Sequence, residues 1–227
     1  MSRGRRCCHG AEHRRLGPFP VLGVRERRRS LSAALAERPP GTGAIRVFAY
    51  GSLLWRPAFL AVSETVAAVD GHCRRFSVWT VHARGTPERP GLGLALEPGP
   101  GKCLGRVLEV DSKTARRDLA GLWEREMHTA VYRPTWLRAR AGGTERWALA
   151  FVPDPASPQY AGALPMAQQA RLIATARGRF GACADYLAET VRALRTAGCP
   201  DAGLERLLAL VRSSPPRRSA TLHSIGR

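Results

Sequence analysis

The chain has 227 residues, of which 44% are hydrophobic, and a formal net charge of +18. This length suits one domain with tails, and no stretch approaches the roughly 18 consecutive apolar residues of a membrane helix. The N-terminus lacks the apolar segment of a secretory signal, so we expect a cytoplasmic protein with no membrane partner.

The positive charge is concentrated near the two ends of the chain. Residues 1–45 carry ten arginines against three glutamates, and residues 212–227 carry four arginines and no acidic residue. Lysine is almost absent from the whole chain, which indicates a GC-rich coding sequence as much as a binding function. Basic tails bind polyanions weakly and in a salt-dependent way, so we expect no specific nucleic-acid partner.

Residues 1–44 are expected to form a basic, disordered N-terminal extension. They contain the basic run RERRRS and the linker-like AERPPGTG, with room for a short helix over residues 30–37. The stretch CCHGAEH (residues 7–13) gathers two cysteines and two histidines. Structural zinc sites need two separated ligand pairs in a folded frame, so we expect no metal site here.

The folded domain is expected to span residues 45–211 and to begin with strands. Residues 45–50 (IRVFAY) form the first strand, and the alternation over residues 66–83 predicts one or two more. Residues 92–110 are expected to form two strands joined by the turn PGPGK. Residues 132–141 and 145–153 are expected to pair as a hairpin around GGT.

Helices follow, mostly in the second half. Residues 111–127 change to a helical period, with Asp111 or Ser112 as the expected cap. Further helices are expected over residues 166–178, 183–198 and 202–213, each closed by glycine or by Ser-Pro punctuation, and the basic tail is expected over residues 212–227. Strands first and helices later indicate an α+β fold.

A tight turn interrupts the apolar run VFAYGSLLWRPAF. Tyr50, Gly51, Ser52 and Leu53 can point successive backbone N–H groups into one concavity, which suits a carboxylate or an oxyanion. Glycine permits close approach of the backbone, and serine adds a hydroxyl. Taken alone, these four common residues favour a structural turn.

The second candidate is Glu126, within LWEREMHTAVYRP. On a helix it shares the inward stripe with Leu122 and Trp123. An apolar site would raise the pKa of such a carboxyl group toward the range that suits a general base. Pairing with Arg125 or Arg133 at a solvated helix end is the alternative.

The two motifs occur in an ordered series with two others. The chain carries YGSL, then WEREMHTAVYRP about 75 residues later, then YAGALP, and finally ATARG followed by DYL. This series, over about residues 45–211, resembles the ChaC-like glutathione-specific gamma-glutamylcyclotransferases. The resemblance implies a small mixed, mostly antiparallel β-barrel flanked by helices, with the site at one barrel mouth.

The resemblance also implies a reaction that needs no metal and no organic cofactor. The α-amine of a γ-glutamyl group attacks its own γ-amide carbonyl, which releases 5-oxoproline; with glutathione the other product is cysteinylglycine. Glu126 would be the general acid/base, and Tyr50–Leu53 would hold the γ-glutamyl group. Tyr132 and Tyr160 are further candidates for substrate binding, and Arg84, Arg133 or Arg177 could meet a substrate carboxylate.

Departures from the family pattern bear on the substrate more than on the reaction. Ala49 stands where glycine is common, and HTAVY replaces a glycine-containing stretch before Tyr132. Two alternatives therefore stay open: a cyclotransferase of the same fold acting on another γ-glutamyl amine or a γ-glutamyl protein, and a non-catalytic polyanion-binding protein. The sequence leaves the oligomeric state open.

Overall fold

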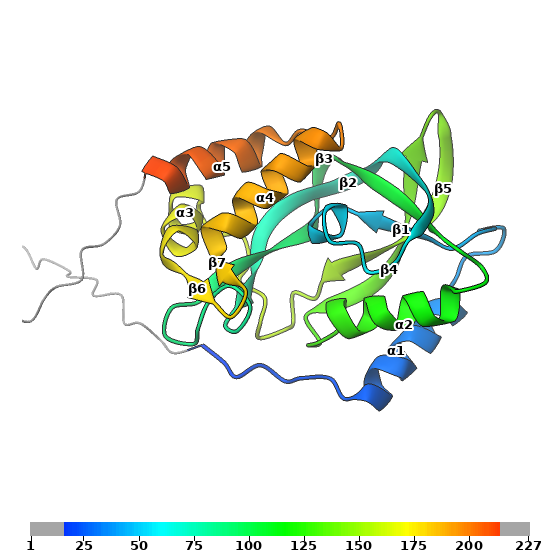
Figure 1. Ribbon diagram of the computed structural model, residues 1–227, viewed down its shortest axis with the longest axis horizontal. Coiled ribbons are helices and arrows are strands. Elements are labelled where there is room, and N and C mark those ends of the chain that lie inside the picture. The colour runs from blue at the N-terminus through cyan, green and yellow to red at the C-terminus, as the bar shows by residue number, and fades with distance from the viewer. Residues whose placement is uncertain (1–15, 214–227) are drawn as a thin grey trace, which may run out of the picture.

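The computed structural model of the protein describes residues 16–213 (Figure 1). The elements, in chain order, are α1 (Val24–Ala36), β1 (Arg46–Ala49), the 3₁₀ turn η1 (Ser52–Leu54), β2 (Ala61–Thr80), β3 (Gly91–Val110), α2 (Ala115–Glu126), β4 (Tyr132–Ala141), β5 (Thr144–Pro153), α3 (Met166–Thr175), β6 (Arg177–Gly178), β7 (Gly181–Ala182), α4 (Cys183–Thr196) and α5 (Ala202–Ser213).

A closed barrel with the strand order β1-β3-β2-β4-β5 forms the centre of the fold. Neighbouring strands are antiparallel, except that β1 runs parallel to β5 where Val47 pairs with Leu149. Phe48, Phe76 and Leu96 are fully buried in the core. Because large apolar side chains fill small barrels, this core leaves no open channel, and the predicted mixed, mostly antiparallel barrel is confirmed.

Strands β2 and β3 form one long bent ribbon, which corrects the expected turn at PGPGK. That segment lies inside β3, where the register slips between the pairs Asp70–Lys102 and His72–Pro98. β3 therefore has more residues than β2 between these two pairs, so the segment forms a bulge that bends the ribbon. The chain bends there but does not reverse, so residues 92–110 belong to one strand instead of two. The predicted hairpin β4–β5 is present, with Gly142 and Gly143 at positive φ in its turn.

The helices cover the barrel in two groups. α3, α4 and α5 lie together against one side, while α1 and α2 lie side by side elsewhere on the barrel (Figure 1). Each group buries its own apolar cluster. The first group contributes Ile173, Leu187 and Leu207, and the second contributes Leu122 and Trp123. No helix between residues 16 and 213 is long and apolar enough to cross a membrane.

The N-terminal segment corrects the expectation of a disordered extension over residues 1–44. From residue 16 onward it packs on the domain: Leu22 N–H donates to the carbonyl of His128, and α1 contacts α2. The indole of Trp123 donates to Ser30 Oγ at 3.2 Å, and the indole of Trp136 donates to the carbonyl of Ala34 at 2.8 Å. Buried indoles need such partners, so α1 completes the domain. The cluster CCHGAEH and residues 214–227 lie outside the described residues.

Helix α2 begins later than expected, with Thr114 instead of Asp111 or Ser112 at its N-cap. Asp111 instead accepts a bond from Lys113 N–H at 2.9 Å in the preceding turn. The Thr114 hydroxyl donates to Asp118 Oδ2 in the first helical turn. Short polar side chains stabilise both turns and helix caps. Asp111, Ser112 and Thr114 are therefore all possible N-caps in the sequence, and the backbone conformation decides between them. α2 ends at Glu126, so the candidate catalytic carboxylate closes the helix.

Candidate active site

A small cavity of about 50 Å³ brings together most of the residues predicted for the site. It is lined by Tyr50, Gly51, Ser52, Leu53, Leu94, Glu126, Tyr132, Phe151 and Tyr186. The loop after β1 and the carboxylate of α2 therefore face one space, although they lie more than 70 positions apart in the chain. This is the juxtaposition that the sequence motifs predicted.

Barrel strands, the 3₁₀ turn and two helices deliver these groups to the cavity. β1 is buried along its whole length and ends at Ala49, so residues 50–53 turn out at the barrel edge into η1. Glu126 is the last residue of α2, Tyr132 is the first residue of β4, and Tyr186 lies in α4. The site therefore depends on the barrel and on both groups of helices.

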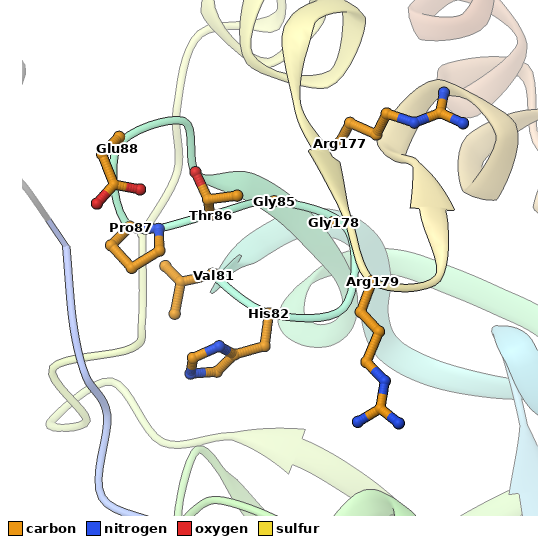
Figure 2. Close-up of a pocket in the computed structure, with 9 residues that line it drawn as sticks. All are labelled: Val81, His82, Gly85, Thr86, Pro87, Glu88, Arg177, Gly178 and Arg179. Carbon is orange, nitrogen blue, oxygen red and sulfur yellow. The ribbon is translucent and has the colours of Figure 1, made fainter.

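A larger hollow of about 650 Å³ lies elsewhere and holds none of the predicted core residues of the site. It is lined by the segment after β2 and by the β6–β7 hairpin, including His82, Arg177 and Arg179. Figure 2 shows that Arg177 and Arg179 extend in different directions. Basic groups that do not converge make a poor anion site, so the smaller cavity is the better candidate for chemistry.

The cavity tyrosines are held in place by bonds to backbone carbonyls. Tyr50 Oη donates to the carbonyl of Phe151 at 2.7 Å, and Tyr132 Oη donates to the carbonyl of Leu94 at 3.2 Å. Burial, followed by the nearby ionisable groups, raises the pKa of Tyr50, Tyr132 and Tyr186. All three phenols therefore stay protonated at neutral pH and present neutral O–H groups beside Glu126.

Glu126 is a mostly buried carboxylate, with 17% of its side chain exposed. Burial raises the pKa of Glu126, while the Arg125 guanidinium, 3.3 Å from Oε1, acts to lower it. Burial has the larger effect, so the net shift is upward toward the range that suits proton transfer. Glu124 is exposed, which agrees with its expected position on another face of the helix.

Arg125 connects the two halves of the site. Its Nη2 donates to Ser52 Oγ at 2.6 Å, and its Nη1 donates to the carbonyl of Arg56. Arg125 also forms the ion pair with Glu126 that the sequence offered as an alternative. The pair is mostly buried, and Glu126 lines the cavity as well.

Several sequence candidates lie away from this cavity. Tyr160 bridges to β2, and its hydroxyl donates to the buried Glu97 at 3.0 Å. Arg133 pairs with Asp154 at 2.8 Å. Arg84 donates to the carbonyl of Ala182 at 3.2 Å and lies over the ring of Tyr186. Tyr160 therefore anchors its loop to the barrel, and the side chains of Arg133 and Arg84 are engaged in contacts within the protein.

Sequence reasoning did not assign Tyr186, Leu94 or Phe151 to the site. Tyr186 belongs to the DYL motif, which was noted only as part of the family pattern; its ring packs edge-on against Phe76 and near Trp55. Leu94 and Phe151 are apolar strand residues that look like any other core residue in the sequence. The DYL motif was thus the one usable signal.

The four cysteines between residues 16 and 213 have structural environments. Cys103, Cys183 and Cys199 are buried free thiols, and Cys73 is a half-buried one. Burial raises the pKa of Cys103 and of Cys183 to about 11, so both remain protonated and unreactive. Within residues 16–213, no three histidine, cysteine or acidic side chains are grouped closely enough to hold a metal ion.

Comparisons with known proteins agree with the geometry. The chain is 36% identical over 188 residues to the glutathione-specific gamma-glutamylcyclotransferase of Escherichia coli, covering 82% of this chain and 80% of that protein. It is 32% identical over 172 residues to the human glutathione-specific gamma-glutamylcyclotransferase 1, covering 74% and 77%.

A crystal structure of a gamma-glutamyl cyclotransferase specific to glutathione from yeast has the same fold, with a TM-score of 0.66 and 21% identity over 74% of this chain and 96% of that one. The family described as "ChaC-like protein" matches residues 45–214. This range includes both motifs and every residue that lines the cavity. The chain therefore belongs to the ChaC-like protein family.

Proposed function

We propose that this protein is a gamma-glutamylcyclotransferase that cleaves glutathione to 5-oxoproline and cysteinylglycine. The observation that carries the proposal is that Tyr50–Leu53 and the buried carboxylate of Glu126 line one cavity. We propose glutathione as the substrate because the similar proteins from Escherichia coli and human are named as glutathione-specific. The buried free thiols suit a reducing compartment, so we place the reaction in the cytoplasm.

The reaction is an intramolecular amide exchange. The α-nitrogen of the γ-glutamyl group forms a bond to its own γ-carbonyl carbon, and the bond from that carbon to the cysteine nitrogen breaks. The α-ammonium loses two protons as it becomes the ring N–H of 5-oxoproline, and the leaving amide nitrogen gains two as it becomes the ammonium of cysteinylglycine, so no water is consumed. The enzyme has to bend the chain and move protons, and correct orientation alone can lower the barrier by roughly 7–11 kcal/mol.

Each half of the site has one role in this scheme. Glu126 takes a proton from the α-ammonium, so that the free amine can attack, and later delivers a proton to the leaving nitrogen, which its raised pKa favours. The backbone N–H groups of residues 51–53 hold the γ-glutamyl group and stabilise the charge that develops on the γ-carbonyl oxygen. Ser52 Oγ accepts a bond from Arg125, which leaves its own O–H free to donate. Tyr132 and Tyr186 line the same cavity and are the further candidates for contact with the substrate.

The test is incubation of the protein with glutathione, γ-Glu-Cys and γ-Glu-Ala, with release of 5-oxoproline as the readout. We expect release from glutathione at the highest kcat/KM. Preference for γ-Glu-Ala would favour the alternative of another γ-glutamyl amine as substrate. Absence of 5-oxoproline with all three substrates would contradict the proposed function.

The pH dependence of kcat/KM should report the pKa of Glu126. The base must be ionised to accept a proton, so activity falls as the pH is lowered through this raised pKa. Because Arg125 lowers that pKa, Arg125→Gln should move the acidic limb of the profile to higher pH. Arg133→Gln, which removes an exposed arginine paired with Asp154, is the control and should leave the limb in place. An unchanged limb in Arg125→Gln would argue against Glu126 as the titrating base.

A further inference from the structure

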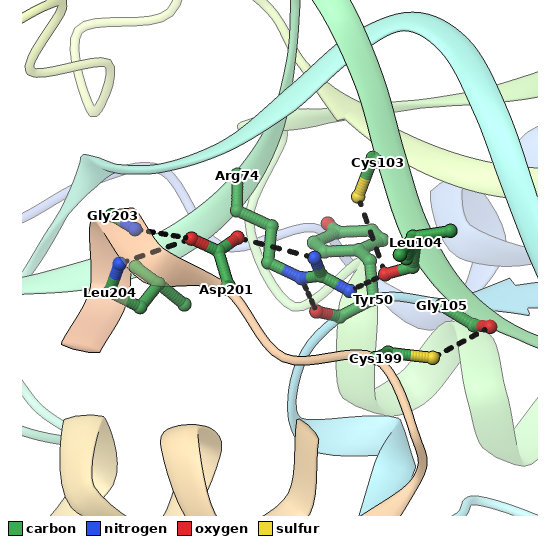
Figure 3. Close-up of polar contacts among 9 residues, drawn as sticks. All are labelled: Tyr50, Arg74, Cys103, Leu104, Gly105, Cys199, Asp201, Gly203 and Leu204. Atoms are coloured by element: carbon green, nitrogen blue, oxygen red, sulfur yellow. Dashed lines mark hydrogen bonds and ion pairs between the residues drawn. The ribbon is translucent and has the colours of Figure 1, made fainter. Parts of the chain in front are cut away.

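Arg74 is a buried arginine that donates a hydrogen bond to the backbone of residues 50–53, which we call the substrate loop. Only 2% of its side chain is exposed. Its Nε donates to the carbonyl of Tyr50 at 2.6 Å, and its Nη2 donates to the carbonyl of Leu104 in β3. Figure 3 shows the guanidinium between these two carbonyls and the carboxylate of Asp201. Arg74 lies in β2, so it joins two strands to the loop that follows β1.

Asp201 fixes the other side of the guanidinium. Its Oδ2 lies 3.3 Å from Arg74 Nη1, while its Oδ1 accepts the N–H groups of Gly203 and Leu204 at 3.0 and 3.1 Å. Asp201 therefore acts as the N-cap of α5, a position where a carboxylate is favoured. The C-terminal helix is linked through one ion pair to a backbone carbonyl at the edge of the cavity.

The bond to the Tyr50 carbonyl has a consequence for Gly51. The peptide group between Tyr50 and Gly51 is planar and trans, so its N–H points opposite to its C=O. Arg74, which is not among the residues that line the cavity, holds this carbonyl, whereas Gly51 lines the cavity. Fixing the carbonyl therefore fixes the direction of the Gly51 N–H, which cannot rotate without breaking a charge-assisted bond.

We infer that Arg74, held by Asp201, is a positioning residue that aims the Gly51 N–H at the substrate. The inference rests on the proposed function, in which residues 51–53 hold the γ-glutamyl group. Arg74 does not line the cavity, so it acts through the loop. Its planar fork bonds to three acceptors at once, which the single ammonium of lysine cannot reproduce.

The chain offers a matched control for a purely structural role. Arg46, at the far end of β1, also donates to two carbonyls, those of Thr42 at 3.1 Å and Ala44 at 3.2 Å. It pairs with Glu109 at 2.9 Å, and 10% of its side chain is exposed. Arg46→Lys therefore weakens a similar buried bonding pattern that does not touch the substrate loop.

The kinetic test compares Arg74→Lys with Arg46→Lys on glutathione. Loss of folded protein lowers the apparent kcat and leaves KM unchanged, whereas a misaimed loop raises KM as well. We expect Arg74→Lys to lower kcat/KM by about 10- to 100-fold, with a raised KM, because small displacements in a site cost this much. Arg46→Lys should keep the wild-type KM. An unchanged KM in Arg74→Lys would overturn the inference.

A second readout does not depend on turnover. The amides of Leu54 and Trp55 donate to the carbonyls of Gly51 and Ser52 at 3.0 and 3.2 Å, so their hydrogen exchange reports the order of the loop. Arg74→Lys should speed this exchange several-fold, and Arg46→Lys should not. Equal exchange in both variants would overturn the inference, and wild-type protein that releases no 5-oxoproline would overturn only the proposed function.

Asp201→Asn gives a milder version of the same test, in case Arg74→Lys folds poorly. Asparagine also caps helices, so α5 keeps its N-terminal bonds while the guanidinium loses its charged partner. We expect a smaller rise in KM than in Arg74→Lys, with exchange at Leu54 and Trp55 faster than in the wild type. A wild-type KM together with wild-type exchange would show that the ion pair does not position the loop.

Discussion

Glu126→Gln is expected to lower the release of 5-oxoproline from glutathione by about 10²- to 10⁴-fold, the range that a general acid/base contributes. Glutamine keeps the size of the side chain and the end of α2 but cannot take a proton from the α-ammonium. The measurement is the initial rate at saturating glutathione. Glu124→Gln, an exposed acidic residue on the same helix, is the control and should keep full activity.

The same variant should remain folded at neutral pH. Burial raises the pKa of Glu126 in the folded protein, so the folded state disfavours the ionised form. The favourable contribution of this group is present below its unfolded pKa and is lost as the pH rises through its folded pKa. Neutral glutamine avoids that loss, so the Tm of Glu126→Gln at pH 7 should equal or exceed that of the wild type. Retained activity in a folded Glu126→Gln protein would refute the mechanism.

Removal of residues 1–44 should destabilise the domain, although the family match begins at residue 45. The shortened protein loses the cover of α1, and the indoles of Trp123 and Trp136 lose their hydrogen-bond acceptors. Lost burial and two unpaired donors together should cost about 3 kcal/mol or more. In a domain of this size this corresponds to a fall in Tm of about 10 °C, which thermal unfolding followed by circular dichroism would measure.

Removal of residues 1–15 alone is the control for this truncation, because it leaves α1 and both indole bonds in place. Its Tm should stay near that of the full chain. Activity should follow the same order, because α1 packs on α2, whose last residue is Glu126. Equal Tm values for both shortened proteins would show that α1 adds nothing to the stability of the domain.

The sequence predicted what depends on periodicity and on family motifs. The alternation in β2 and the GGT turn predicted strands and a hairpin that the structure contains, and the motifs paired Tyr50–Leu53 with Glu126. It could not show that PGPGK is a bulge, because proline and glycine favour turns and bulges equally. Pairing with β2, and not the local sequence, decides that the chain bends but continues as one strand.

The N-terminal segment and Tyr160 illustrate a second limit. Arginine-rich composition predicted a disordered extension over residues 1–44 with room for a short helix over residues 30–37, but the apolar face of α1 has a partner on α2 that no local pattern reveals. Tyr160 occurs in a family motif, yet its hydroxyl meets Glu97 instead of the cavity. A motif identifies residues that matter together, while only the three-dimensional path separates contact with substrate from support of the fold.

The parallel junction of β1 and β5 explains why a binding cavity exists at this place. One residue pair, Val47 with Leu149, joins the two strands in the closed barrel. Beyond it, the Tyr50 phenol, and not a strand amide, meets the carbonyl of Phe151, so the barrel is joined there by a side chain. β1 ends at Ala49, so the amides of residues 51–53 lie beyond its hydrogen-bond ladder. The end of β1, at this junction of the closed barrel, thus supplies polar backbone groups that a substrate can use.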